Sequence, residues 1–200
     1  MTQKKMILLS GSGDTVAWFR LEFLNEFLLR SYKVYVLAPG IREDLKPQLE
    51  EMGVEFIEIN LDRKGFDVLN LVLSVNELRK LFKDIQPDII FSYTHKAILS
   101  GALAAKISGF SNIFSLITGT GHIFDGHTLK ERFIKNIGSL ALKLALKFNK
   151  LVFFQNIDDS NLFLKNNIAK PHQARLVNGS GVNLNKFSLT PLPSQPIFLC

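Results

Sequence analysis

The chain has 200 residues, 46% of them apolar and 21% charged, which is enough for one sizeable domain with its own core. This balance excludes a disordered chain, a collagen-like chain and a coiled-coil array. The single cysteine, Cys200, excludes an internal disulfide framework and a zinc site built from cysteines.

The net charge of +6 is unevenly distributed. Residues 1–126 carry 14 Lys and Arg against 15 Asp and Glu, whereas residues 127–200 carry 10 against 3. The basic last third indicates an anionic partner, either nucleic acid, a phosphorylated substrate or anionic lipid. A solvated basic face without a partner is the alternative.

The N-terminus lacks the pattern of a secretion signal. The apolar run Met6–Leu9 is followed at once by Ser-Gly-Ser-Gly-Asp. A signal sequence needs an apolar core of roughly 7–15 residues, and a membrane-spanning helix needs about 20. We therefore expect a cytoplasmic protein, with contact to a membrane surface still open to it.

Short apolar runs alternate with segments of helical period along the whole chain. The runs predict seven buried strands: Met6–Ser10, Val34–Ala38, Val54–Ile59, Asp88–Ser92, Asn112–Ile117, Leu151–Phe154 and Arg175–Asn178. The main predicted helices are Val16–Leu29, Leu69–Ile85, Ala97–Ser108 and Leu129–Lys150. This order predicts a doubly wound parallel α/β sheet, Rossmann-like, with ligands bound beyond the carboxyl ends of the strands.

The turn after the first strand is Gly11-Ser12-Gly13-Asp14. Its glycines let the backbone approach a ligand, and the next helix offers N–H groups to an anion. The turn lacks the third glycine of the dinucleotide-binding fingerprint and the Gly-Lys-Ser/Thr of a P-loop. The alternative is a simple strand–helix turn in which Asp14 is the N-cap.

The fourth strand leads into Thr94-His95-Lys96. Thr94 is a candidate cap of the following helix, and Lys96 falls in that helix's first turn, where a cation is disfavoured. A lysine in this position indicates a bound anion, and a solvent-facing lysine is the alternative.

The fifth strand leads into a polar loop, Thr118–His127. His122 or His127 in this loop is a candidate general base or phosphate ligand, and His122 is the preferred catalytic candidate. Two histidines without a carboxylate or cysteine partner do not make a metal site, so we expect no metal.

The segment Leu129–Lys150 predicts the longest helix. Lys135, Lys143 and Lys147 lie on a basic line, and apolar residues that include Leu140 and Leu144 fill the opposite side. A basic stripe beside a broad apolar face is typical of a membrane-surface helix, and a core helix with a solvated stripe is the alternative.

The last third of the chain holds two further turns and a linker. Asp158 is the expected N-cap of a helix after the sixth strand, and Asn178–Asn183 is a glycine turn. Three prolines at residues 191–196 indicate a linker, after which Ile197–Cys200 begins an apolar strand. We expect one domain over residues 1–187, with 188–200 as the linker and first strand of a second domain. A final edge strand of the same sheet is the alternative.

Together these motifs resemble the N-terminal half of a GT-B glycosyltransferase of the retaining GT4 type. The similarity is greatest to the bacterial enzymes that extend sugars on undecaprenyl diphosphate in capsule, O-antigen or related polysaccharide synthesis. The resemblance covers nearly the whole chain. It rests on Gly13-Asp14 with Phe19-Arg20, Val34–Pro39, Arg63-Lys64-Gly65, Gln86–Ile90 with Tyr93–Lys96, Ile117–Gly121, Phe153–Asp159 and Gly179–Asn183.

The resemblance implies an acceptor-binding domain that touches the cytoplasmic face of the membrane. It implies a lipid-linked sugar acceptor, a nucleotide-sugar donor (UDP-linked) held by a missing C-terminal domain, and no further cofactor. It also implies that this chain alone does not catalyse. The residues that it assigns to acceptor or donor binding are Gly11, Gly13, Asp14, Arg20, Thr94, Lys96, Thr118, Gly119, Gly121, Asn156, Ser180 and Gly181.

The sequence departs from the family pattern at two places. Gly119 stands where many such enzymes have a histidine, and Asn183 stands where they have a hinge aspartate. Three other functions stay open. They are a nucleotide-sugar epimerase of the same architecture, a non-catalytic acceptor-binding subunit of a two-chain transferase, and a nucleic-acid-binding protein.

Overall fold

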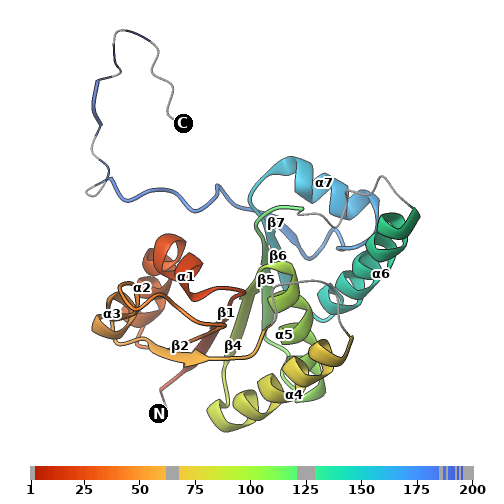
Figure 1. The fold of residues 1–200 in the computed structure, drawn as a ribbon, viewed down its shortest axis with the longest axis horizontal. Coiled ribbons are helices and arrows are strands. Elements are labelled where there is room, and N and C mark those ends of the chain that lie inside the picture. The colour runs from red at the N-terminus through yellow and green to blue at the C-terminus, as the bar shows by residue number, and fades with distance from the viewer. Residues whose placement is uncertain are drawn as a thin grey trace.

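The computed structural model describes residues 3–61, 68–120, 129–184, 187, 189–191, 193 and 195. Its centre is a seven-stranded, all-parallel sheet (Figure 1). The strands are β1 (Lys5–Leu9), β2 (Lys33–Ala38), β3 (Glu55–Glu58), β4 (Ile89–Tyr93), β5 (Ile113–Ile117), β6 (Leu151–Phe154) and β7 (Ala174–Leu176). All seven predicted strands and the predicted parallel sheet are confirmed.

The strand order is β3-β2-β1-β4-β5-β6-β7. Successive residues of β1 point to opposite faces of the sheet, and Met6, Ile7, Leu8 and Leu9 are all fully buried. Strands of this kind read as continuous apolar runs because helices cover both faces of a parallel sheet. For this reason the strands are readable from the sequence.

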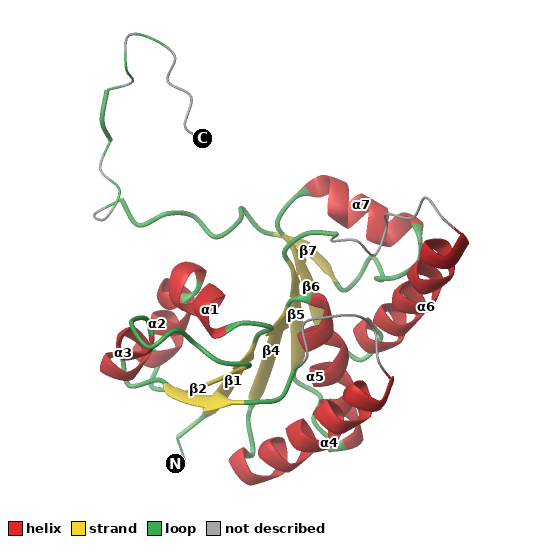
Figure 2. Cartoon of the chain, viewed as in Figure 1, coloured by secondary structure: helices red, strands yellow, loops and turns green. Residues whose placement is uncertain are grey.

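Helices lie on both sides of the sheet (Figure 2). They are α1 (Gly13–Phe19), α2 (Leu21–Leu29), α3 (Lys46–Glu51), α4 (Val68–Ile85), α5 (His95–Ile107), α6 (Leu129–Leu146) and α7 (Ile157–Lys165). Helices α1 to α3 cover one face, and α4 to α7 cover the other. The direction of winding therefore reverses between β1 and β4, which defines the switch point of the sheet.

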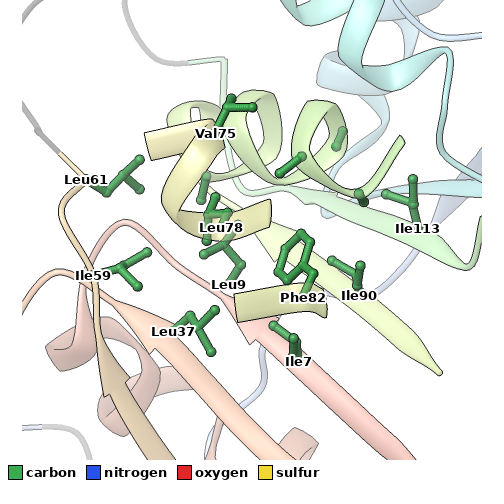
Figure 3. Packing of buried hydrophobic residues seen from close by; sticks show 14 of the residues in the cluster. Ile7, Leu9, Leu37, Ile59, Leu61, Val75, Leu78, Phe82, Ile90 and Ile113 are labelled. Atoms are coloured by element: carbon green, nitrogen blue, oxygen red, sulfur yellow. The ribbon is translucent and has the colours of Figure 1, made fainter. Parts of the chain in front are cut away.

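The largest core cluster lies between the sheet and helices α4 and α5 (Figure 3). Phe82 and Leu78 of α4 pack over Ile7 and Ile90 of the central strands. Helix α5 approaches the sheet closely, since a Cβ atom on Gly101 would lie 2.5 Å from Leu9 Cδ2. Small residues of α5 line this contact, and Ala97, Ala102 and Ala105 are fully buried.

Two predictions about helices are wrong. The segment predicted as one helix over Val16–Leu29 forms two, because Arg20 leaves the helical conformation with φ −129° and ψ 4°. Asp14 is not the N-cap of the first helix: Ser12 holds that position, and the Asp14 carboxylate instead accepts the backbone N–H of Arg42 at 2.8 Å. The periodic pattern hides the break because no glycine or proline marks it.

Two other features concern the ends of the chain and the membrane. The strand expected at Ile197–Cys200 lies outside the described residues. Among the helices of the described segments, none is long and apolar enough to cross a membrane.

Candidate functional site

The loops after β1 and β4 meet at the switch point. A Cβ atom on Gly11 would lie 2.7 Å from Thr94 Oγ1, so only glycine fits opposite this threonine. Thr94 itself has φ 70° and ψ 140°, in a region that β-branched residues rarely adopt. Strained backbone of this kind is concentrated at functional sites.

Thr94 lies at the start of α5, as predicted, but its side chain does not cap the helix. It is the N-cap residue of α5, yet its side chain makes no capping hydrogen bond. Its Oγ1 is buried and has no hydrogen-bond partner among the residues that the structure describes. A buried hydroxyl without a partner is costly, so this atom is suited to a ligand or a water molecule.

Hydroxyl groups connect the start of helix α1 to the end of strand β4. Thr15 Oγ1 donates to the carbonyl of Ser12 at 2.9 Å and lies 2.9 Å from Tyr93 Oη. Since the Thr15 proton is used in the first bond, Tyr93 donates in the second. Burial raises the pKa of Tyr93, so its hydroxyl stays neutral.

Arg20 points inward from the break between α1 and α2. Its side chain lies over the Tyr93 ring, with 4.8 Å from the guanidinium carbon to the ring centroid. One guanidinium nitrogen donates to the carbonyl of Phe19 at 2.9 Å and to Ser180 Oγ at 2.6 Å. The irregular backbone at residue 20 therefore directs a cation toward the carboxyl edge of the sheet.

The buried charge of Arg20 has no acidic partner in the described part of the chain. Arg20 is 7% exposed and its Nε has no hydrogen-bond partner, while the ion pairs between described residues all involve exposed side chains elsewhere. Burial lowers the pKa of the guanidinium, a sign of its desolvation. Buried charges are normally paired, so Arg20 is the residue best suited to bind an anionic ligand.

Gly13 faces away from this site. Its N–H donates to the carbonyl of Gly40 at 3.0 Å, and a Cβ there would lie 2.4 Å from the same oxygen. The absence of a side chain at residue 13 thus allows the close approach of the loop after β2. Gly13 and Asp14 both have contacts that hold α1 against that loop.

Ser180 joins the site from the segment after β7. Its Oγ accepts from Arg20 and, at 3.1 Å, from Gln155 Nε2. Gly179 and Gly181 on either side have φ of 69° and 67°, which favours glycine. The glycine turn predicted here is therefore tied to the break between α1 and α2.

The loops after β5 and β6 border the site on its other side. Thr118 is exposed, and a Cβ atom on Gly119 would meet no atom within 4 Å. Asn156, rather than the predicted Asp158, is the N-cap of α7, because its side-chain oxygen accepts the N–H of Asp159 at 2.7 Å. Its amide also donates to the Asp159 carboxylate at 2.9 Å.

The sequence assigns no role to His95. It is the first residue of α5, and its imidazole forms a hydrogen bond with the main chain of Gly119. Burial is the main cause of a lowered pKa, which the Gly119 bond and the charge of Asp159 oppose. Nothing in the local pattern distinguishes this histidine, since the contact joins the loops after β4, β5 and β6.

Lys96 lies in the first turn of α5, as predicted, and is half-buried. The predicted residues Gly121 and His122, with His127, lie outside the described residues. In the segments that the structure describes, no group of three or more His, Cys, Asp or Glu side chains is placed to hold a metal ion.

Helix α6 differs from its predicted arrangement. Leu142, Ala145 and Leu146 are buried, whereas Leu140 and Leu144 are 68% and 51% exposed. The two exposed leucines share the outer face with Lys143 and Lys147 instead of lying opposite them. The side chain of Lys135, the third predicted basic residue, is not among those that the structure describes.

Two known glycosyltransferases are similar to this chain. An N,N'-diacetylbacillosaminyl-diphospho-undecaprenol alpha-1,3-N-acetylgalactosaminyltransferase of Campylobacter jejuni is 25% identical over 179 residues, which cover 90% of this chain and 47% of that protein. A glycosyltransferase structure from Rickettsia africae matches with a TM-score of 0.63 and 18% identity, over 96% of this chain and 47% of that one.

The same fold occurs in a second class of enzyme. The UDP-N-acetylglucosamine 2-epimerase of Rickettsia bellii matches with a TM-score of 0.57 and 16% identity, over 95% of this chain and 52% of that one. This chain spans about half the length of the relatives it matches. Residues 6–156 match the model of the "Glycosyl transferase 4-like" family. The chain, an α/β domain that corresponds to half of a GT-B fold, belongs to the glycosyl transferase 4-like family.

Proposed function

We propose that this chain is the acceptor-binding domain of a retaining sugar transferase. The transferase moves a sugar from a UDP-linked donor to a polyprenyl-diphosphate-linked glycan in polysaccharide synthesis. The family match supports sugar transfer. The activity of the Campylobacter jejuni relative, which acts on a diphospho-undecaprenol-linked sugar, supports an acceptor of this class.

The single observation that carries the proposal is that the buried Arg20 at the switch point has no acidic partner among the described residues. Its guanidinium lies over Tyr93 and beside Ser180, at the edge where a parallel sheet binds ligands. Guanidinium groups recognise phosphate oxygens through paired N–H donors. A diphosphate supplies the negative charge that this arginine lacks within the described residues.

Lys96 extends the cationic surface to the start of α5. The N-terminus of this 13-residue helix adds its dipole and its N–H groups to the same edge. We assign Thr94 and Lys96 to the acceptor, Gly11 to the close approach of the two loops, and Ser180 and Gly181 to the hinge. Thr118, Gly119, Gly121 and Asn156 border the transferred sugar in this proposal, and His122 remains its catalytic candidate.

Helix α6 is the proposed contact with the membrane. Its outer face combines exposed Leu140 and Leu144 with Lys143 and Lys147. Apolar side chains that enter the headgroup region beside lysines are the combination that binds anionic lipid surfaces. A lipid-linked acceptor requires such a contact, so the protein is peripheral on the cytoplasmic face of the membrane.

The donor site belongs, in this proposal, to a second domain of which residues 188–200 are the linker and first strand. The 200-residue chain then binds acceptor without transferring sugar. This division predicts that acceptor affinity can be measured on the chain alone.

Calorimetric titration of the chain tests the proposal. The ligands are a short-prenyl diphosphate, its N,N'-diacetylbacillosaminyl and N-acetylglucosaminyl derivatives, and UDP-N-acetylglucosamine. We expect the prenyl diphosphates to bind, and Lys96→Ala to weaken them about tenfold with little effect on the nucleotide sugar. If Lys96→Ala loses the same affinity for both ligand types, Lys96 is not part of the acceptor site. Binding of the nucleotide sugar alone would favour an epimerase-like role.

A further inference from the structure

Polar atoms without partners are concentrated at the end of β4. In the described part of the chain, seven buried side-chain nitrogen and oxygen atoms have no hydrogen-bond partner. Three of them, Ser92 Oγ, Thr94 Oγ1 and His95 Nε2, fall within four consecutive residues. Unsatisfied buried groups are few in folded domains, so their concentration indicates a ligand or ordered water.

The three atoms do not face one place. A Cβ atom on Gly101 would lie 2.8 Å from Ser92 Oγ, so this hydroxyl lies under α5 in the interior. Thr94 and His95 follow the last residue of β4 and lie at the carboxyl edge itself. Thr94 Oγ1 faces Gly11 in the loop after β1, whereas His95 contacts Gly119 in the loop after β5. The candidate subsite is therefore His95 Nε2 alone.

The hydrogen bond to Gly119 fixes the state of the His95 ring. Nε2 has no partner, so Nδ1 makes the bond, as a donor to the Gly119 carbonyl. A neutral imidazole that donates from Nδ1 presents a lone pair at Nε2. Such a nitrogen accepts a hydrogen bond from a hydroxyl or amide, and it repels a fully ionised phosphate oxygen.

The two sides of Tyr93 therefore differ in charge. Arg20 lies over the ring on the side of β1 and supplies a buried cation. His95 lies on the side of β5, and its ring supplies a neutral group suited to a polyhydroxylated ligand. The space at Gly119 is open, since a Cβ atom there would contact nothing within 4 Å.

We propose that His95 Nε2 holds a hydroxyl of the acceptor sugar, so that His95 selects and orients the sugar that is extended. This inference rests on the proposed function and adds the orientation in which the acceptor is bound. The diphosphate lies toward Arg20, and the sugar crosses the end of β4 toward Gly119. No proton is transferred to His95 in this arrangement. The ring positions the hydroxyl by accepting one hydrogen bond.

Two variants separate the two ring nitrogens. In His95→Asn the amide stands where Nδ1 stood and keeps the bond to Gly119, but nothing replaces Nε2. In His95→Gln the amide reaches the position of Nε2. If His95 is only structural, His95→Asn keeps its function. If His95 binds the sugar, His95→Gln keeps part of its function and His95→Asn does not. Thermal melting followed by circular dichroism checks that both variants fold.

The experiment is titration of the chain and both variants with the short-prenyl-diphosphate sugars named above and with a series of their monodeoxy analogues. We expect one deoxy analogue to bind the natural chain about tenfold more weakly than its parent sugar. We expect His95→Asn to bind the parent and this analogue equally. His95→Gln should recover part of the discrimination.

The outcomes separate this inference from the proposed function. If the unmodified prenyl diphosphate binds but no hydroxyl is coupled to His95, the sugar-binding role is wrong and the acceptor site stands. If His95→Asn discriminates the deoxy analogues as the natural chain does, the inference is likewise overturned. If no prenyl diphosphate binds, both the proposed function and the inference fail.

Discussion

Gly11 and Thr94 are matched in shape across the switch point of the sheet. The added Cβ of an alanine at residue 11 would lie 2.7 Å from Thr94 Oγ1, well inside van der Waals contact. Thr94 cannot easily yield, because its backbone already has φ 70° and its side chain branches at Cβ. The two loops that bear the candidate site can therefore approach this closely only because residue 11 has no side chain.

Gly11→Ala should destabilise the protein by about 1–3 kcal/mol, the usual cost of overpacking. Urea unfolding measures this change. Adding Thr94→Ala removes Oγ1 and should restore most of the loss, which makes the pair a double-mutant cycle. Gly138→Ala in α6 is the matched control, because a Cβ there meets nothing within 4 Å. A Gly11→Ala protein as stable as the natural one would mean that the loops can separate freely.

Arg20→Met should abolish stabilisation by pyrophosphate. With a dissociation constant of about 1 mM, 10 mM pyrophosphate adds about 1.4 kcal/mol to the free energy of unfolding, a rise of about 3–6 °C in Tm. Arg42→Met is the control, since Arg42 is exposed and paired with Asp44 at 2.7 Å. Scanning calorimetry with and without the anion gives the result. If pyrophosphate raises the Tm of the Arg20 variant as much as that of the natural chain, Arg20 does not bind the anion.

Acidification should destabilise the protein through His95. Its pKa is lowered in the folded state, chiefly by burial, while an unfolded histidine titrates near about 6.5. The unfolded chain therefore binds the proton more readily, and stability falls as pH drops below that value, by at most about 1.4 kcal/mol per pH unit. Urea unfolding between pH 7 and pH 5.5 should show a smaller slope in His95→Asn. Identical slopes would contradict the burial of a neutral ring.

Binding to anionic vesicles should depend on the outer face of α6. Replacing Leu140 and Leu144 with Asn should weaken sedimentation with phosphatidylglycerol vesicles several-fold, because it removes exposed apolar area beside Lys143 and Lys147. Ile107→Asn in α5 is the control, as it is equally exposed at 58% but lies on another helix. Binding should also fall with salt. If the Ile107 variant loses as much binding, α6 is not the specific contact.

The sequence predicts the strands well because each is an apolar run buried on both faces, as in Met6–Leu9. It also locates the two ends of the site, Gly11 and Thr94, because loops after parallel strands meet at one edge. It does not reveal the break at Arg20, where a 3.6-residue pattern continues across two helices. Nor does it reveal His95, whose contact with Gly119 depends on the neighbouring positions of β4 and β5 in the sheet.

Hydrogen exchange is the most direct test of the central claim that the switch-point edge binds a diphosphate-linked sugar. The chain is compared alone, with a short-prenyl-diphosphate amino sugar, and with UDP-N-acetylglucosamine. We predict that the prenyl ligand slows exchange of backbone amides in residues 11–20 and 94–98, and that the nucleotide sugar does so far less. Protection confined to other segments, or equal protection by both ligands, would contradict it.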